Sequence, residues 1–215
     1  MLRSLLTAGR AVTRRVPWIA SLAQRYGSTC LGVAAKLAGR VRVGGGVFTT
    51  RAPFIALAAA GEMLKGTYEI NERRALDAVL DPGLPVIDCG ASLGIVACLV
   101  NSRLTHPERH VAVEANPDLL PVLERHRAMN GAHFQMLHAA VAYGAAQVEF
   151  NVSGNSLAGS LAGHGGRRVH VPAVTLRQVA DQYGFEQFGL LCDIEGAEMD
   201  ILRHDEAVLV ERARW

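Results

Sequence analysis

The sequence of 215 residues predicts an α/β fold in which a mostly parallel sheet is covered by helices. Two observations lead to this prediction. Between residues 85 and 141, short runs of strand-forming apolar residues alternate with helix-like segments, and the links between them are short. Half of the residues are hydrophobic but only 6% are aromatic, a composition that suits helices packed on a sheet. A chain of this length forms one large domain, or one domain with an extension.

The distribution of charge separates the start of the chain from the rest. Residues 1–61 contain nine Lys or Arg and no Asp or Glu, whereas residues 62–215 contain thirteen basic and twenty acidic residues. We therefore predict a basic, mainly helical N-terminal extension over residues 1–61 and a second domain over residues 62–215.

Three interpretations of the basic extension stay open. We favour an ordinary pair of surface helices; the alternatives are a weak contact with an anionic membrane surface and an organelle transit segment. A nucleic-acid partner is not expected, because the mildly acidic body would repel phosphates. No apolar run reaches the length of a membrane span, so we expect a cytoplasmic protein, with a peripheral membrane contact as the alternative. The sequence leaves the oligomeric state open.

The first third of the chain is predicted to be mainly helical. Residues 5–41 have a helical pattern, with breaks expected near Pro17 and Gly27. Residues 41–50 form a short β element around the glycines at 44–46. Residues 67–80 form a helix that Asp81, Pro82 and Gly83 end.

The alternating pattern begins after this helix. Strands are expected at 86–88, 110–115 and 134–141, with helices at 93–104 and up to about residue 129, the second capped by Asn116, Pro117 and Asp118. Residues 147–152 and 168–174 form an antiparallel hairpin around a glycine-rich connection. A helix at 175–183, a fourth core strand at 190–194 and helices at 198–203 and 207–213 follow.

The stretch VIDCGASLG at 86–94 holds the first candidate binding residues. A strand ends at Asp88, and Gly90 and Gly94 bracket the turn into the next helix, where backbone N–H groups can meet a ligand. The glycine spacing is not the G-x-G-x-x-G of dinucleotide-binding proteins, and the acid would repel a pyrophosphate. A carboxylate at this place suits a ligand with an ammonium or sulfonium group, and S-adenosylmethionine carries both.

The next two strand ends support a nucleoside site. Glu114 ends the second strand, where an acid accepts hydrogen bonds from ribose hydroxyls. Asn116 follows it and can lie against the edge of an adenine, and Ala140, near the end of the third strand, can wall the adenine ring. Because parallel strands present their carboxyl ends at one edge of the sheet, these residues are expected to face one crevice.

The chain resembles the FkbM family of S-adenosylmethionine-dependent methyltransferases. The matching motifs occur in the family's order over residues 66–202: GTYEINE, VIDCGASLG, VAVEANP, AAV followed by the hairpin, VPAVTL and LLCDIEGAEMDIL. The resemblance implies a Rossmann-like class I methyltransferase sheet, mostly parallel, with an inserted β-hairpin and here a helical N-terminal extension. It also implies O-methylation of a hydroxyl group on a sugar or another small molecule.

The resemblance further implies roles for individual residues. Asp88, Gly90, Ala91 and Gly94 would hold the methionine end of S-adenosylmethionine, Glu114 would hold the ribose, and Glu69 would orient the donor or close the site. Asp193 would face the transferable methyl group, with Glu195 nearby, and either carboxylate could act as the catalytic base. No metal site is expected.

The sequence departs from the family pattern at some positions. Cys192 and Arg177 stand where the family commonly has Lys and Asp, respectively, and the family has further strands after the last motif, so we expect the domain over 62–215 to be C-terminally incomplete. Two other functions remain as alternatives: a nucleotide-dependent oxidoreductase on a similar sheet, and a non-catalytic or decayed nucleoside-binding module.

Overall fold

The computed structural model describes residues 17–52, 54–152, 166–194 and 196–215, with side chains described from residue 27 onward. The glycine-rich connection predicted between the two hairpin strands therefore lies largely outside the described residues, and so does Glu195.

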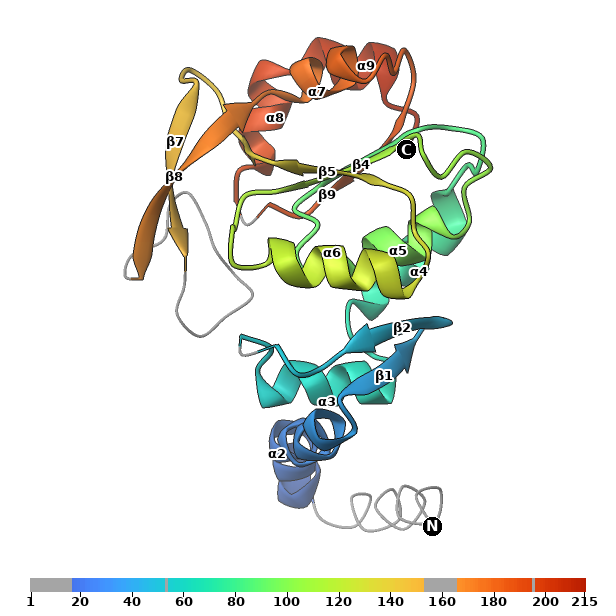
Figure 1. The fold of residues 1–215 in the computed structure, drawn as a ribbon, viewed down its shortest axis with the longest axis vertical. Coiled ribbons are helices and arrows are strands. Elements are labelled where there is room, and N and C mark those ends of the chain that lie inside the picture. Colours follow the sequence, from blue (N-terminus) through green and yellow to red (C-terminus); the bar gives the residue numbers. More distant parts are fainter. Residues whose placement is uncertain (1–16, 53, 153–165, 195) are drawn as a thin grey trace.

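A parallel sheet of four strands forms the centre of the molecule (Figure 1). Its strands are β3 (Val86–Cys89), β4 (His110–Glu114), β5 (Gln135–His138) and β9 (Gly189–Cys192), in the order β5-β4-β3-β9. All residues of β3 and β4 are buried, which explains why both strands are mostly apolar in the sequence, apart from Asp88 in β3 and the terminal residues His110 and Glu114 of β4. The predicted α/β fold with a mostly parallel sheet is confirmed.

Helices cover both faces of this sheet (Figure 1). One face carries α4 (Ile70–Val79), α5 (Ile95–Asn101) and α6 (Leu120–Met129), and the other carries α7 (Leu176–Gln182), α8 (Glu198–His204) and α9 (Glu206–Arg212). Residues of β3 alternate between the two cores: Ile87 and Cys89 pack with residues of α7, α8 and α9, whereas Val86 packs with Leu76 of α4. Asp88 therefore lies on the α4 and α5 face.

The predicted hairpin is present as the antiparallel pair β7 (Gln147–Val152) and β8 (Arg167–Val174). The preceding strand differs from the prediction, because the expected strand at 134–141 is divided at Ala139. β5 pairs with β4 only as far as His138, and β6 (Ala140–Val141) then pairs with β8 instead. Ala140 packs there in a small core with Phe150.

The N-terminal part consists of α2 (Pro17–Ala38), β1 (Arg40–Val43), β2 (Gly46–Thr49) and α3 (Leu57–Lys65). The predicted break at Gly27 is wrong, because α2 continues through it, and α3 was not predicted. The two helices cross at close range: a Cβ atom on Gly32 would collide with the Leu57 carbonyl, and one on Gly61 with the Ser28 carbonyl. The expected boundary between residues 61 and 62 falls inside α3, and the division into domains stays a prediction.

We expect Gly61→Ala to destabilise the protein, although alanine is the better helix former. Alanine in a helix gains about 1 kcal/mol over glycine, but the backbone collision with Ser28 outweighs this, giving a net loss of about 1–3 kcal/mol. Gly27→Ala is the matched control, because no atom lies within 4 Å of its added Cβ, and it should be stabilising. Urea unfolding of both variants measures the difference; equal stability of the two would contradict the tight crossing.

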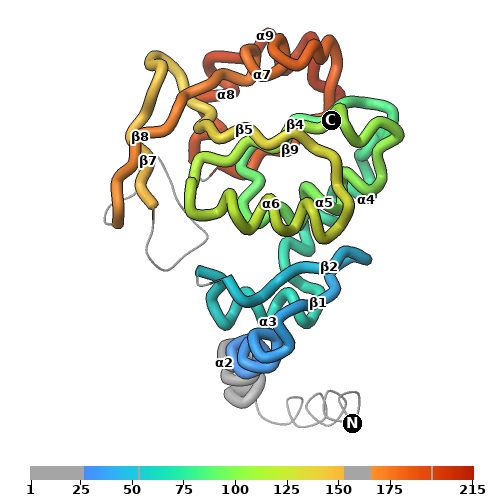
Figure 2. Tube along the Cα trace, viewed as in Figure 1, coloured from blue at the N-terminus to red at the C-terminus, as the bar shows by residue number. Residues whose placement is uncertain are grey.

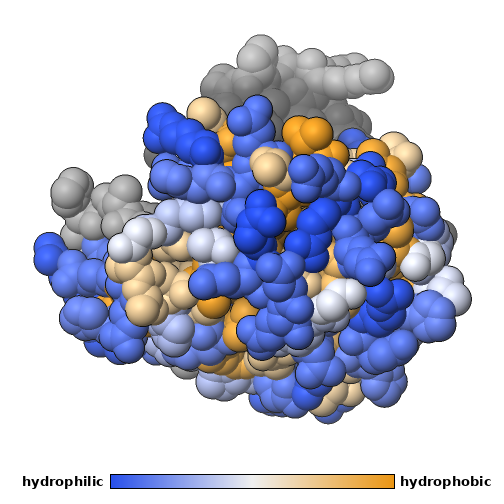
Figure 3. Space-filling view, turned by 90° about the horizontal axis from the view of Figure 1, so that it is seen from above, coloured by the Kyte–Doolittle hydropathy of each residue, from blue (hydrophilic) through white to orange (hydrophobic). Residues whose placement is uncertain are grey.

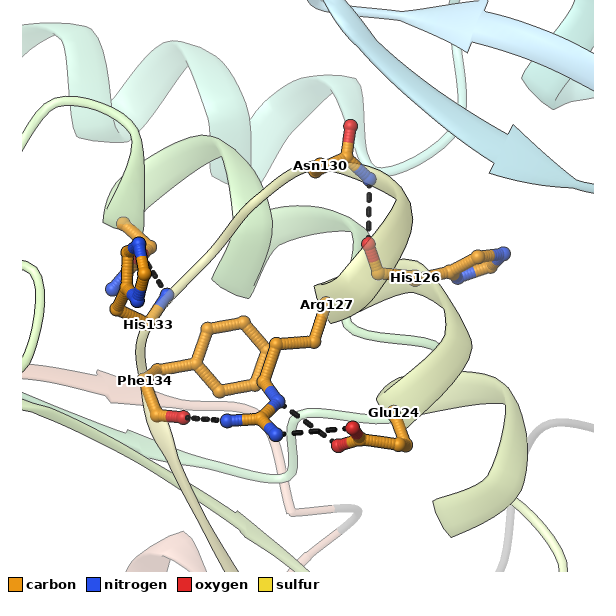
Figure 4. Close-up of polar contacts among 7 residues, drawn as sticks. Glu124, His126, Arg127, Asn130, His133 and Phe134 are labelled. Carbon is orange, nitrogen blue, oxygen red and sulfur yellow. Dashed lines mark hydrogen bonds and ion pairs between the residues drawn. The ribbon is translucent and has the colours of Figure 1, made fainter.

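Side chains of α6 fix the β1–β2 hairpin to the body. Asn130 pairs with both backbone groups of Val47, accepting from its N–H at 2.7 Å and donating to its carbonyl at 2.9 Å. The Thr49 N–H donates to Nε2 of His126 at 2.9 Å, and Nδ1 of the same ring donates to the Leu93 carbonyl at 2.7 Å. Figure 4 shows Asn130 also donating to the His126 carbonyl, one turn earlier in the helix. The side chains of Asn130 and His126 thus satisfy backbone groups of β2 that would otherwise need a neighbouring strand.

The last residues of the chain run alongside β9. Phe188 and Ala213 form a parallel bridge, and the Leu190 N–H donates to the Trp215 carbonyl at 2.9 Å. In the Cα trace of Figure 2, the C-terminus accordingly lies at the sheet. The Trp215 indole packs against Gly189, where a Cβ atom would collide with the ring.

Candidate functional site

Carboxylates from three chain segments meet on one face of the sheet. Asp88 stands opposite Ala112 of β4 and Leu191 of β9 in the strand register. Side chains two residues apart on a strand point to the same side, so Glu114 shares the face of Asp88, and Asp193, two residues after Leu191, follows the same alternation. Asp88, Glu114 and Asp193 therefore lie on the same side of the sheet, as the strand register requires.

Asp88 is the most enclosed of these acids. It is 5% exposed, and its Oδ2 atom has no hydrogen-bond partner among the described residues. Burial, followed by repulsion from Glu114 and Asp193, raises the pKa of Asp88 to about 7. An ionised carboxylate in this position is costly for the fold, and a cation beside it would remove that cost.

Glu69 brings a further acid from the segment before α4. Its backbone lies in the left-handed region, with φ of 47°, a strained conformation for a residue with a side chain. Burial raises the pKa of Glu69 to about 8; a hydrogen bond with Tyr68 acts against the rise, and repulsion from Asp88 adds to it. The strained backbone also explains why α4 begins at Ile70 rather than at the predicted residue 67.

Tyr68 links Glu69 to the turn after β3. The phenol is buried and makes side-chain hydrogen bonds with Glu69 and Ser92. Burial, followed by repulsion from the Glu69 carboxylate, raises the pKa of Tyr68. Ser92 has φ of 50°, and within the described chain only Glu69 and Ser92 have a positive φ without being glycine. Tyr68 is hydrogen-bonded to both. Arg73 supports the same segment by donating to the Tyr68 carbonyl at 3.0 Å.

Glu114 is held by backbone donors. One carboxylate oxygen accepts from the Ser92 N–H and the other from the Asn116 N–H, both at 2.7 Å. The pKa of Glu114 is nevertheless raised, because its burial outweighs these bonds. The Ala115 N–H also bonds this carboxylate, and of its roughly four acceptor positions about one is left for a hydroxyl group of a ligand.

The turn after β3 fits closely between its neighbours. Gly90 has φ of 89°, and a Cβ atom there would collide with the Asp193 carbonyl; a Cβ on Gly94 would collide with the Leu123 side chain. The amide groups of Gly90 and Ala91 both donate to the Val113 carbonyl, at 2.9 and 3.0 Å. The prediction that N–H groups of this turn are free for a ligand is therefore wrong for these two, which bind β4 instead.

A cavity of about 280 Å³ opens beside these acids. Five of the predicted site residues line it: Glu69, Asp88, Gly90, Ala91 and Asp193. Gly94, Glu114, Asn116 and Ala140 are not among its lining residues. Sequence reasoning missed Glu72 and the apolar wall, which consists of Ala75, Leu76, Val79, Val96, Leu190, Leu191 and Trp215. The spacing of residues 72, 75, 76 and 79, which places them on one side of α4, is the signal that could have found most of these residues.

Asn116 and Ala140 are placed by other contacts. The Asn116 side chain accepts from the Asp118 N–H at 3.0 Å and forms a turn, and α6 begins only at Leu120, with Leu119 in the capping position. The prediction that Asn116 and the two following residues cap this helix is thus wrong. Ala140 is buried against the β7–β8 hairpin.

Asp193 lies at the open side of the site. Its side chain is exposed, and its N–H donates to the Cys89 carbonyl at 3.0 Å, which holds it beside the end of β3. Partial burial raises the pKa of Asp193, and repulsion from the carboxylates of Glu72 and Glu198 adds to the rise. Glu198 accepts from the N–H groups of Ile194 and Gly196 at 3.2 and 2.9 Å, so it fixes the turn before α8.

The arrangement suits a ligand with a positive charge and an apolar portion. Four carboxylates, from Glu69, Glu72, Asp88 and Asp193, line one cavity with an apolar wall, and no basic residue is among its lining. The unpartnered Asp88 oxygen offers a place for a buried cation. Within the described ranges, no group of three or more His, Cys, Asp or Glu is placed to hold a metal ion.

Comparison with known proteins identified one family. A family model described as the methyltransferase FkbM domain matches residues 88–214, which is more than half of the chain. Searches among curated proteins and among solved structures found no significant match. No helix in the described part of the chain is long and apolar enough to cross a membrane.

Proposed function

Because the chain belongs to the FkbM methyltransferase family, we propose that it uses S-adenosylmethionine to methylate a hydroxyl group of a small molecule or carbohydrate. Methyl transfer follows from the family, whereas the donor and the hydroxyl acceptor are our proposals. The observation that supports the donor best is the buried, unpartnered Asp88 carboxylate on a cavity lined by three further acids.

The residues present fit this donor. Asp88 and Glu69 would hold the cationic methionine end, and a positive charge between them would lower both of their raised pKa values. Gly90 has no side chain, so the turn leaves space for the donor. Glu114, held by the N–H groups of Ser92 and Asn116, would accept a hydrogen bond from a ribose hydroxyl. When bound, S-adenosylmethionine supplies a methyl group already activated by the positive sulfur.

The protein must also remove a proton from the acceptor. Asp193 is exposed at the open side of the cavity, and its raised pKa makes it a better base than an ordinary aspartate. Glu195, the alternative base, lies outside the described residues. The apolar wall across the cavity would exclude water and orient the acceptor, and orientation of this kind contributes about 7–11 kcal/mol to a displacement.

Titration calorimetry tests the donor. We expect S-adenosylhomocysteine to bind and NAD not to bind, because four carboxylates would repel a pyrophosphate. Binding of NAD alone would favour an oxidoreductase, and binding of neither would favour a decayed module; both results would contradict the proposal.

The Asp193→Asn variant tests the base. After incubation with S-adenosylmethionine and a panel of hydroxylated compounds, the wild-type protein should yield acceptors heavier by one methylene unit. Asp193→Asn should lower kcat by about 10²–10⁴-fold and leave the affinity for S-adenosylhomocysteine almost unchanged. Asp200→Asn, an exposed acid of α8 paired with Arg203, is the matched control. Unchanged turnover in Asp193→Asn would remove Asp193 from the role of base.

A further inference from the structure

Three apolar side chains are exposed together where α2 ends and α3 begins. Val33 is 48%, Leu37 76% and Leu57 38% exposed. Val33 and Leu37 are one turn apart on α2 and share one side of it. Leu57 begins α3 where this helix crosses α2, with its carbonyl against Gly32, the neighbour of Val33 in the chain. We call these three residues, with the basic residues at the end of α2 and on β1, the α2–α3 face.

Basic side chains lie at the C-terminal end of α2 and on the strand that follows it. Arg51 donates to the Leu37 carbonyl at 3.3 Å, and Lys36 donates to the Ala52 carbonyl at 2.8 Å, so both lie at the end of α2. Arg40 and Arg42 occupy the two exposed positions of β1, which starts directly after α2. No acidic residue precedes Glu62 in the chain, so no carboxylate from this segment neutralises these cations.

We propose that the α2–α3 face binds the surface of an anionic lipid bilayer. Exposed aliphatic side chains beside cations match the boundary between acyl chains and anionic headgroups, where each kind of side chain finds a favourable partner. Binding is peripheral, since no described helix is long and apolar enough to cross a membrane. This proposal does not depend on the proposed methyl transfer.

Other occupants of the face fit its chemistry less well. A second copy of the chain would bring two sets of cations together, and like charges at an interface are unfavourable. A nucleic acid would satisfy the cations through its phosphates but would leave Val33, Leu37 and Leu57 without apolar partners. A bilayer surface satisfies both.

The α2–α3 face and the helices α7, α8 and α9 lie at opposite ends of the molecule. In Figure 1, α2 lies at one end of the molecule and the helices α7, α8 and α9 lie at the other. Figure 3 views this second end, whose surface is mostly hydrophilic with dispersed apolar residues. Docking through the α2–α3 face would therefore point the α7–α9 end away from the membrane.

Flotation of the full chain with lipid vesicles tests the proposal. The chain should float with vesicles of phosphatidylcholine and phosphatidylserine, should not float with phosphatidylcholine alone, and should be released by high salt. Leu37→Glu should lower vesicle binding about tenfold or more, and the double variant Arg40→Gln, Arg42→Gln about 30-fold. Val210→Glu is the matched control, because Val210 is 74% exposed on α9, and it should bind as wild type.

Several outcomes would overturn the proposal. The first is no flotation with anionic vesicles, or equal flotation with both kinds of vesicle. The second is an equal loss of vesicle binding in Leu37→Glu and Val210→Glu. The third is release from the vesicles by duplex DNA whose phosphate concentration is below that of the anionic lipid. Leu37 is largely exposed, so Leu37→Glu should unfold at the same urea concentration as wild type. This check separates loss of binding from loss of fold.

Discussion

Asp88→Asn is expected to stabilise the protein at pH 8 while it removes donor binding. The pKa of Asp88 is raised to about 7, so the ionised carboxylate at pH 8 costs the fold about 4 kcal/mol relative to an ordinary aspartate. An amide carries no charge but still lacks partners, and we expect a net gain of about 2 kcal/mol in the free energy of unfolding. Affinity for S-adenosylhomocysteine should fall about 100-fold, because its ammonium group loses a buried charge partner.

The stabilisation should depend on pH in a defined direction. Between the ordinary aspartate pKa and about 7, the folded protein holds a proton on Asp88 that the unfolded chain has released. Wild-type stability therefore falls as the pH rises through this window, and the advantage of Asp88→Asn should disappear by about pH 4. Urea unfolding of wild type and Asp88→Asn at pH 4 and pH 8 measures this difference in stability.

Asp77→Asn provides the control for this prediction. Asp77 lies on α4 with a side chain that is 63% exposed, and its replacement should change stability by less than about 0.5 kcal/mol at either pH. The prediction fails if Asp88→Asn is less stable than wild type at pH 8, or if it binds S-adenosylhomocysteine with wild-type affinity.

His126→Ala is expected to cause the largest loss of stability. The imidazole is fully buried, packs edge-on against Phe48 with ring centroids 5.1 Å apart, and bonds Thr49 and Leu93 through its two nitrogens. Its removal leaves a cavity and two buried backbone groups without partners, so we expect a loss of about 4 kcal/mol in the free energy of unfolding. Because Leu93 belongs to the turn after β3, donor affinity should fall as well.

Two further measurements make this prediction specific. His133→Ala, which replaces an exposed histidine in the link between α6 and β5, should change stability by less than about 0.5 kcal/mol. Proteolysis should cut His126→Ala first around the β1–β2 hairpin, since Thr49 has lost its partner on α6. A loss of less than about 1 kcal/mol would show that the histidine is not needed to hold the hairpin.

The sequence predicts the sheet well because strand burial leaves a direct pattern. β3 and β4 are buried on both faces, so each is mostly apolar, and the acids Asp88 and Glu114 stand near the carboxyl ends of these strands. The parallel arrangement then places Asp88 and Glu114 on one face without further information. Sequence reasoning accordingly found Asp88 and Asp193 on the cavity, whereas the predicted residues Glu114 and Ala140 do not line it.

The remaining features arise from contacts between distant segments. Gly32 and Gly61 have weak helix propensity, yet both lie in helices because α2 and α3 pack at close range there. The division of the third strand depends on pairing with β8, and the apolar wall of the cavity depends on how α4 lies over β9. The spacing on α4 marks one side of that helix, but no local pattern in the sequence places this side over β9 or divides the third strand.

The two nitrogens of His126 have a consequence for how the molecule loses its structure. Nε2 accepts from Thr49 of the β1–β2 hairpin, and Nδ1 donates to Leu93 of the turn after β3. One ring therefore holds both segments. The β1–β2 hairpin and the turn after β3 are therefore expected to unfold together, because displacement of the His126 ring breaks both hydrogen bonds.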